Sequence, residues 1–120
     1  MLYACHVATT VMALGVLFRR SRLILFGFSF HLGAGFWGYL FDICEHHTTT
    51  WTSVLAHVLP LAVGLFEVRR TGMPKWAPRA SCAFLAFSVV YAYFLTPSTM
   101  NVNLAHRPFG PVAAYAPGLL

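Results

Sequence analysis

The stretch that decides the fold is a long apolar run, residues 23–43, which reads LILFGFSFHLGAGFWGYLFDI. It carries no charged residue before Asp42. As a helix, a run of this length rises about 1.5 Å per residue and covers the roughly 30 Å hydrocarbon core of a bilayer. A backbone inside lipid must satisfy its own hydrogen bonds, and a helix does so. Residues 23–43 therefore predict a membrane-spanning helix.

The composition of the whole chain points the same way. Of its 120 residues, 58% are hydrophobic and only 9% are charged, whereas an average soluble domain has about 25% charged residues. The mean hydropathy is +0.68. These values exclude an ordinary water-soluble domain. The net charge of +5 does not indicate a nucleic-acid partner, because that interpretation needs a basic face on a soluble fold.

Three further apolar runs, residues 1–18, 51–68 and 80–95, are shorter. We therefore expect an all-α, multi-pass membrane helical bundle of about four transmembrane helices in one domain, residues 1–95. The first run lacks the basic residues that precede the apolar core of a signal peptide, so we expect it to be retained. Residues 96–120 contain several prolines and glycines, which predict an irregular tail packed along a partner or in the membrane interface.

Basic residues gather in two clusters between the apolar runs. The four-span arrangement puts seven of the eight on one side: Arg19, Arg20, Arg22, Arg69, Arg70, Lys75 and Arg79. It leaves Asp42, Glu45 and Arg107 opposite. By the positive-inside rule, the basic side faces the cytosol or, in an organelle inner membrane, the matrix. We expect the seven side chains to contact phospholipid head groups, those of cardiolipin in a mitochondrial inner membrane.

Two histidines lie inside predicted spans that run in opposite directions. They are His31 and His57, and ionisable residues inside a membrane are costly and often functional. One interpretation is that a neutral imidazole hydrogen-bonds to a neighbouring helix and holds the bundle together. The other is a haem or quinone site, since two histidines at one depth on facing helices can ligate haem iron. Their depths differ by about three residues, roughly 5 Å, which disfavours haem.

A polar stretch after the second run contains residue types that bind metals: Cys44, Glu45, His46 and His47. No second cluster supplies the remaining ligands of a closed tetrahedral site. We therefore predict an interfacial loop and no metal site there. The cysteines at positions 5, 44 and 82 fall in separate segments without CxxC spacing, which is typical of plain apolar residues.

Three more features of the predicted spans lead to structural predictions. Pro60 should bend residues 51–68 and release a backbone carbonyl near the histidine of that run. Ala34 and Gly38 have the small-xxx-small spacing that lets helices approach closely. Glu67 precedes Arg69 and Arg70, so we expect it to be a local ion partner.

Several short motifs follow one another between residues 23 and 95: Phe36-Trp37, Asp42, His57-Val58-Leu59-Pro60, Glu67 and Pro78-Arg79-Ala80-Ser81. In this order they resemble the androgen-induced transmembrane protein family, multi-pass threonine hydrolases of fatty-acid esters of hydroxy fatty acids. The resemblance implies that His57 acts as general base on a threonine, for which an earlier helix offers Thr9 and Thr10. The family's asparagine before the histidine and its aromatic-Tyr-Pro ending are absent, which favours a relative that kept the bundle and lost the chemistry.

Three functional hypotheses follow, and we favour the one without catalysis. It is a non-catalytic accessory or structural subunit of a larger membrane complex, such as a mitochondrial respiratory or ATP-synthase assembly. Its partners are other membrane subunits and phospholipids, with no cofactor besides bound lipid. The alternative is a small intramembrane lipid-ester hydrolase in which Thr9 or Thr10 is the nucleophile and His57 the base. The third is a haem- or quinone-binding anchor subunit that uses His31 and His57.

Overall fold

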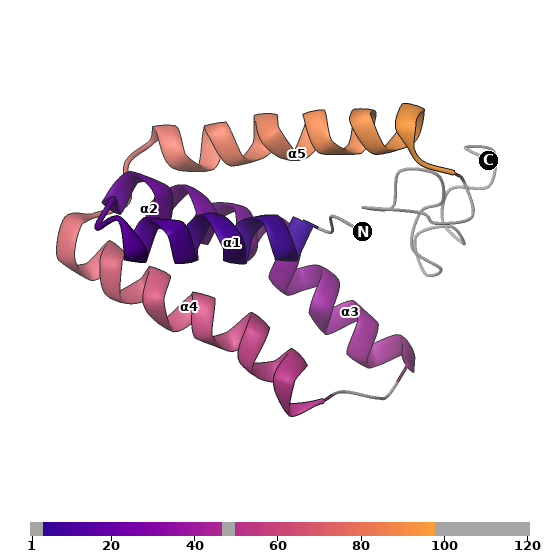
Figure 1. Ribbon diagram of the computed structural model, residues 1–120, viewed down its shortest axis with the longest axis horizontal. Coiled ribbons are helices and arrows are strands. Elements are labelled where there is room, and N and C mark those ends of the chain that lie inside the picture. The colour runs from indigo at the N-terminus through magenta and orange to yellow at the C-terminus, as the bar shows by residue number, and fades with distance from the viewer. Residues whose placement is uncertain (1–3, 47–49, 98–120) are drawn as a thin grey trace.

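The computed structural model describes residues 4–46 and 50–97, and every regular element in these ranges is helical. Helix α1 covers Ala4–Leu17 and is followed by α2 (Ser21–Phe30), the π-helical turn η1 (His31–Gly35) and α3 (Phe36–His46). Helix α4 covers Trp51–Thr71 and α5 covers Trp76–Leu95. The four predicted apolar runs thus correspond to four helical segments, which confirms the all-α prediction (Figure 1). The predicted tail lies outside the described residues from position 98 onward.

Three helical segments of the described part are long and apolar enough to cross a membrane: Ser21–Leu40, Trp51–Thr71 and Trp76–Leu95. The described part of α1 has 14 residues. At 1.5 Å per residue it covers about 21 Å, less than a hydrocarbon core of about 30 Å. The bundle is therefore multi-pass with three spans of full length, and a fourth span by α1 stays a prediction.

The second apolar run changes its helical geometry halfway along. In η1 the N–H of Phe36 bonds to the carbonyl of His31, five residues earlier. Such a π turn is a known cause of helix kinks, and Figure 1 shows α3 leaving α2 at an angle. Helix α3 then continues through His46. Residues 44–46 are therefore the last turn of a helix, and the predicted loop was wrong for them.

The ends of α4 and the start of α5 follow from local chemistry. Thr50 caps α4, because its Oγ1 accepts a hydrogen bond from the backbone N–H of Ser53 at 3.2 Å. Gly72 ends the helix with φ of 78°, a conformation that glycine adopts without steric cost. Helix α5 begins earlier than predicted, at Trp76. Pro78 is then in its first turn, where the missing N–H has no helical partner to lose.

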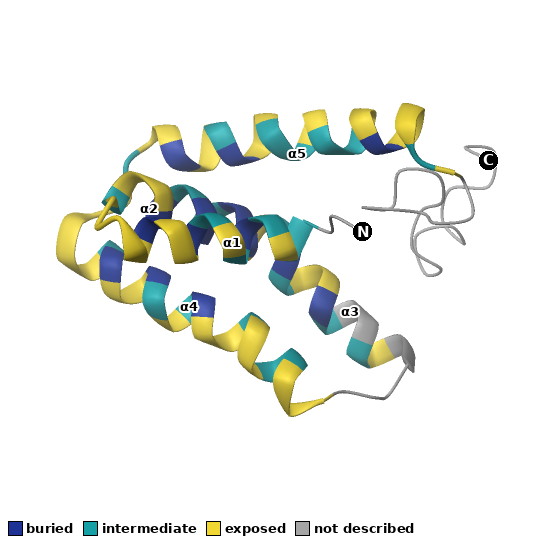
Figure 2. Ribbon diagram, in the orientation of Figure 1, coloured by how far each residue is buried: buried dark blue, intermediate teal, exposed yellow. Residues whose placement is uncertain are grey.

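Helix α2 is the centre of the bundle, and it packs against α1, α4 and α5. In the span Ser21–Leu40, which begins with α2, 44% of the apolar window is buried, against 17% in α4 and 11% in α5. Figure 2 shows the same pattern, with buried residues on α2 and on the helix faces turned toward it. A core cluster of Met12, Ile24 and Phe28 joins α1 to α2 and meets partly buried side chains of α4. Helix α2 therefore provides the central packing surface for the other helices.

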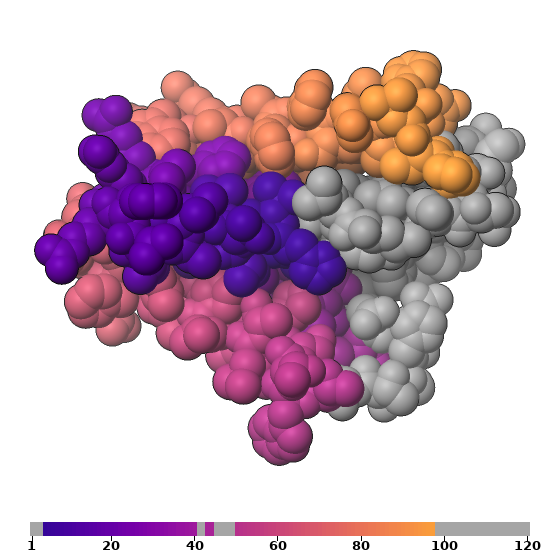
Figure 3. All heavy atoms as spheres, viewed as in Figure 1, coloured from indigo at the N-terminus to yellow at the C-terminus, as the bar shows by residue number. Residues whose placement is uncertain are grey.

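Helix α5 is attached mainly to α2, on the side opposite α4 (Figures 1 and 3). The ring of Phe84 packs edge-on against Phe26 and Phe30, with centroid distances of 5.8 and 5.2 Å. Ser81 Oγ lies 2.9 Å from the carbonyl oxygen of Ala77 in its own helix and 3.2 Å from that of Phe26. The aromatic contacts of Phe84 and the hydrogen bond of the Ser81 hydroxyl thus attach α5 to the bundle.

Glycines allow the close helix contacts, but not those that the spacing of Ala34 and Gly38 predicted. A Cβ added at Gly64 would overlap the ring of Phe28, and one at Gly27 would lie 2.9 Å from the carbonyl oxygen of Ala8. At Gly38 an added Cβ meets no atom within 4 Å among the described residues. No helix of the described part therefore packs closely against Gly38, and a close helix contact at this position stays a prediction.

Pro60 does not end α4, which is helical from Trp51 to Thr71. Its ring is buried. A proline inside a helix removes one backbone hydrogen bond to the residue four positions earlier, here Ala56. Helix α4 tolerates this loss, and the backbone groups near His57 are the ones affected.

Candidate functional site

The π turn η1 places His31 where α1, α2 and α4 meet. Its side chain is 0% exposed. The Nε2 atom lies 2.9 Å from the carbonyl oxygen of His57 on α4. Because a carbonyl oxygen only accepts, Nε2 carries the proton and donates. The first of the two sequence interpretations, a neutral imidazole bonded to a neighbouring helix, is the arrangement that the structure has.

His57 makes contacts of its own with α3 and α4. Its Nδ1 lies 2.8 Å from the carbonyl oxygen of Ser53, one turn earlier in the same helix. Its ring stacks on that of Tyr39, with centroids 4.0 Å apart and planes within 6°. Sequence reasoning missed Tyr39 and Ser53. For Tyr39 there was a signal, since it follows His31 by about two helical turns and so shares a face with it.

The second nitrogen of His31 is unusual. Nδ1 is buried and has no hydrogen-bond partner within residues 4–46 and 50–97. A Cβ added at Gly35 would lie 2.9 Å from this nitrogen and 3.0 Å from the Cα of Cys5. Gly35 and α1 thus enclose the acceptor side of the imidazole closely. A buried acceptor without a partner costs free energy.

This arrangement does not fit a haem held between the two histidines. Their ring centroids are 5.7 Å apart and the planes are tilted by 32°. A haem ligand must direct a ring nitrogen at the iron, but one nitrogen of His31 points at the His57 carbonyl and the other at Gly35 and Cys5. The imidazole pair therefore joins helices and has no nitrogen of His31 turned toward a cofactor.

The threonine and histidine of the hydrolase hypothesis are not joined. Thr9 is half-buried and Thr10 exposed, both on α1. Among the described residues no hydrogen bond connects either hydroxyl to His57, whose Nδ1 is bonded to the Ser53 carbonyl. A nucleophile and its base need to lie within hydrogen-bond reach. The structure therefore does not form this pair.

Of the metal-binding residue types at the end of α3, only Cys44 has a side chain in the described part of the chain. No three or more His, Cys, Asp or Glu side chains gather within residues 4–46 and 50–97. Cys44 is a free, exposed thiol. The side chains of Asp42, Glu45 and His46 lie outside the described part, as does all of His47. Cys5 and Cys82 are also free thiols, on α1 and α5.

The two basic clusters lie at the same end of the bundle (Figure 1). All seven side chains are exposed: Arg19, Arg20, Arg22, Arg69, Arg70, Lys75 and Arg79. A hydrogen bond of 3.0 Å from Arg70 Nη2 to Ser21 Oγ ties the end of α4 to the start of α2. Arg70 also donates to the carboxylate of Glu67, from Nη2 at 2.7 Å and from Nε at 3.1 Å. The local ion partner predicted for Glu67 is confirmed, and it is Arg70.

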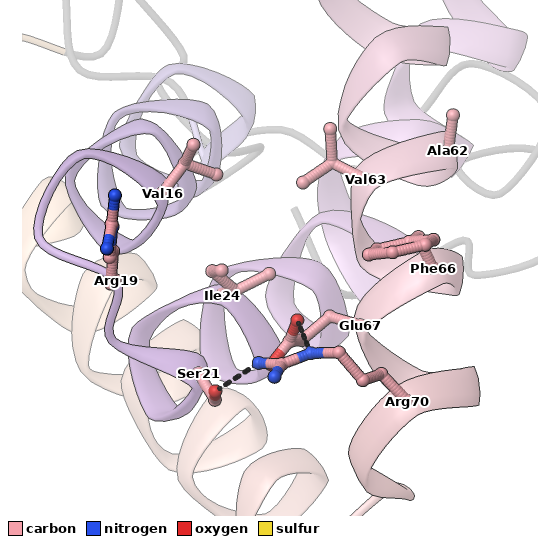
Figure 4. A pocket seen from close by; sticks show the side chains of 9 residues that line it. All are labelled: Val16, Arg19, Ser21, Ile24, Ala62, Val63, Phe66, Glu67 and Arg70. Carbon is pink, nitrogen blue, oxygen red and sulfur yellow. Dashed lines mark hydrogen bonds and ion pairs between the residues drawn. The ribbon is translucent and has the colours of Figure 1, made fainter.

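A groove of about 640 Å³ opens beside this ion pair. Figure 4 shows Arg19 and Ser21 on the side of the α1–α2 turn, with Glu67 and Arg70 on α4. The remaining lining is apolar and consists of Val16, Ile24, Ala62, Val63 and Phe66. The groove thus combines a charged mouth at the basic end with an apolar wall formed by α1, α2 and α4.

The backbone at the end of α1 is held in a shape that normally selects glycine. The N–H of Arg20 bonds to the carbonyl of Gly15 at 2.7 Å, and that of Arg19 to the carbonyl of Val16 at 3.1 Å. This pair of bonds is a Schellman motif. Arg19 occupies its left-handed position with φ of 51°, where a residue with a Cβ is strained. The motif places a guanidinium group at the mouth of the groove.

The fold and these sites define the class of this protein: a multi-pass membrane protein built as an all-α helical bundle. Comparison with known proteins adds no relative, since no family model, no curated protein and no solved structure matches the chain.

Proposed function

We propose that this chain is a non-catalytic structural subunit of a larger membrane protein assembly. Two of its buried polar side chains, His31 and Ser81, support this role, because they contact backbone carbonyls. His31 bonds to α4, and Ser81 of α5 contacts a carbonyl of α2. Hydrogen bonds of this kind hold membrane helices together.

The observation that carries the proposal is the environment of Gly33 and Gly38. An added Cβ at either position meets no atom within 4 Å among the described residues. A glycine inside a helix costs about 1 kcal/mol relative to alanine, and membrane helices use glycine where another helix comes close. Gly15, Gly27 and Gly64 have such a use inside the chain. Gly33 and Gly38 do not, which supports a partner helix against this face.

The surface beside Gly33 suits a helix. A shallow groove of about 330 Å³ runs between η1, the start of α3 and α5. Gly33, Ala34 and Trp37 line one side, and Cys82 and Leu85 line the other. The indole of Trp37 is 53% exposed. A partner helix with an apolar side chain at its centre would fill the groove and bury this ring.

Helices α4 and α5 have many exposed positions (Figure 2), and large apolar side chains occupy a number of them, which leaves surface for lipid or for further subunits. The large exposed side chains of α5 are Phe87, Val90, Tyr91, Tyr93, Phe94 and Leu95. Exposed apolar surface is expected where lipid surrounds a protein, so by itself it does not select a partner. The charge asymmetry supports an orientation with the basic turns toward the cytosol or matrix, and a mitochondrial inner membrane is part of this proposal.

The test is the size of the particle that contains the chain in its native membrane. After extraction in a mild detergent, the tagged chain should migrate as a complex well above its own 13.3 kDa plus the micelle. A second copy with another tag shows whether the complex contains only this chain. G33L/G38L should release the chain from the complex, because leucine fills the space of a close helix contact.

The matched control is A56L, which adds a leucine at an exposed position of α4. This variant should stay in the complex. A wild-type chain that migrates alone, or a G33L/G38L chain that remains in the complex, would overturn the proposal.

A further inference from the structure

We propose that the groove between the α1–α2 turn and α4 binds one anionic phospholipid, with its phosphate at Arg19 and Arg70 and an acyl chain along the apolar wall. The site goes beyond the subunit role and does not depend on it. Of the seven basic residues at this end of the bundle, only Arg19 and Arg70 line the groove. The proposal therefore gives these two a role in lipid binding that the other five do not share.

Arg70 is positioned to receive a phosphate. Its Nε and Nη2 atoms are occupied by Glu67 and Ser21. A guanidinium has five N–H donors, and the two on Nη1 have no partner among the described residues. The side chain is 57% exposed, whereas that of Glu67 is 6% exposed. The ion pair thus fixes the guanidinium in place and leaves one of its edges open.

The charges at the mouth of the groove fit a ligand with a single negative charge. Arg19 and Arg70 contribute two positive charges and Glu67 one negative charge, which leaves one positive charge to be matched. Phosphatidylglycerol carries one phosphodiester charge, and arginine is well suited to phosphate because it can donate two parallel hydrogen bonds.

The apolar wall favours a lipid over free phosphate. Behind the charged mouth the groove is lined by Val16, Ile24, Ala62, Val63 and Phe66 (Figure 4). These side chains lie on α1, α2 and α4, on the side of the arginines that faces the apolar part of each helix. With the arginines among the head groups, an acyl chain would begin at this wall. A small inorganic anion would leave this wall uncovered, and an acyl chain would cover it.

The experiment measures how tightly the full-length protein in detergent micelles binds phosphatidylglycerol that carries a fluorescent label on one acyl chain. Phosphatidylcholine with the same label is the reference. The measurement is made in 1 M salt, where the Debye length falls to about 3 Å and distant charges are screened. The key variant is E67Q/R70Q, which removes one negative and one positive charge and leaves no unpaired buried carboxylate. The matched control is R69Q, which removes an exposed positive charge outside the groove.

The wild-type chain should prefer phosphatidylglycerol to phosphatidylcholine, and inorganic phosphate should not displace it. E67Q/R70Q should bind it about fivefold more weakly although its net charge is unchanged, and R69Q should bind it as the wild type does. The opposite order, with R69Q weakened and E67Q/R70Q unaffected, would show attraction by net charge alone and would overturn the proposal. Equal binding of the two lipids by the wild type, or displacement by inorganic phosphate, would overturn it too. Circular dichroism confirms that each variant is helical.

Discussion

The imidazole Nε2 of His31 donates a hydrogen bond of 2.9 Å to the backbone carbonyl of His57, not to its ring. The contact joins the π turn of the second segment to α4. Because the acceptor belongs to the main chain, the side chain of His57 is free to bond to Ser53 and to stack on Tyr39. The buried His31 and the partly buried His57 therefore connect η1, α3 and α4 without forming a ligand pair.

This relationship predicts the tautomer of His31. In a chain with ¹⁵N-labelled histidine, His31 should be neutral with its proton on Nε2, since Nε2 donates and Nδ1 has no partner in the described part. The same tautomer should persist in H57A, because the acceptor is a backbone carbonyl. Nitrogen chemical shifts in detergent measure both. A proton on Nδ1, or a changed tautomer in H57A, would contradict the hydrogen bond.

Two glycines should respond in opposite ways to alanine. G64A forces a methyl group into the ring of Phe28 and should lower the free energy of unfolding by about 1–3 kcal/mol. G38A should keep or raise the stability of the isolated chain by up to about 1 kcal/mol, because its Cβ enters open space and alanine favours the helix. Denaturant titration in detergent, followed by circular dichroism, measures the difference. Equal effects of the two variants would mean that α2 and α4 are not packed as described.

The left-handed backbone at Arg19 makes a third prediction. R19G should stabilise the turn by about 1 kcal/mol, since glycine adopts this φ without a clash between Cβ and the backbone. Arg20, with φ of −106°, is the control. R20G should be neutral or slightly destabilising, because an ordinary conformation gains nothing from glycine. If R19G is no more stable than R20G in thermal unfolding, the Schellman turn is not formed.

The two residues of the ion pair at the basic end should contribute unequally to stability. R70Q leaves the carboxylate of Glu67 without its partner at a 4% exposed position, whereas E67Q leaves an arginine that reaches water. Thermal unfolding should therefore rank the chains with R70Q least stable, E67Q closer to wild type, and E67Q/R70Q more stable than R70Q alone. A double variant that is less stable than R70Q would show that the two groups act independently.

The sequence predicted the helices and the ion pair because both depend on local pattern. Apolar runs bounded by arginines mark where a helix meets the membrane surface. Glu67 and Arg70 are three residues apart, a spacing at which helical side chains meet. The start of α5 differed, because the helix begins at Trp76 and includes Pro78 and the charged Arg79, which precede the apolar run.

The features that were missed depend on neighbours distant in sequence. The π turn at His31–Gly35 leaves no mark in an apolar run, because hydrophobicity is the same in both kinds of helix. Spacing alone favoured Gly38 for close packing, although the contacts that need glycine occur at Gly27 and Gly64. The sequence also did not predict that His31 bonds to a backbone carbonyl. Comparing the depths of two histidines in the membrane considers their side chains and not the backbone atoms nearby.

The most direct measurement asks on which side of the membrane the turns lie. In a chain without native cysteines, single cysteines at Arg20, Met73 and Thr52 are labelled in sealed, oriented vesicles with a maleimide that does not cross the bilayer. R20C and M73C should react from one side, because both lie in turns at the basic end, and T52C should react from the other. Labelling of R20C and M73C from opposite sides would contradict the membrane bundle and, with it, the placement of the groove at a single head-group layer.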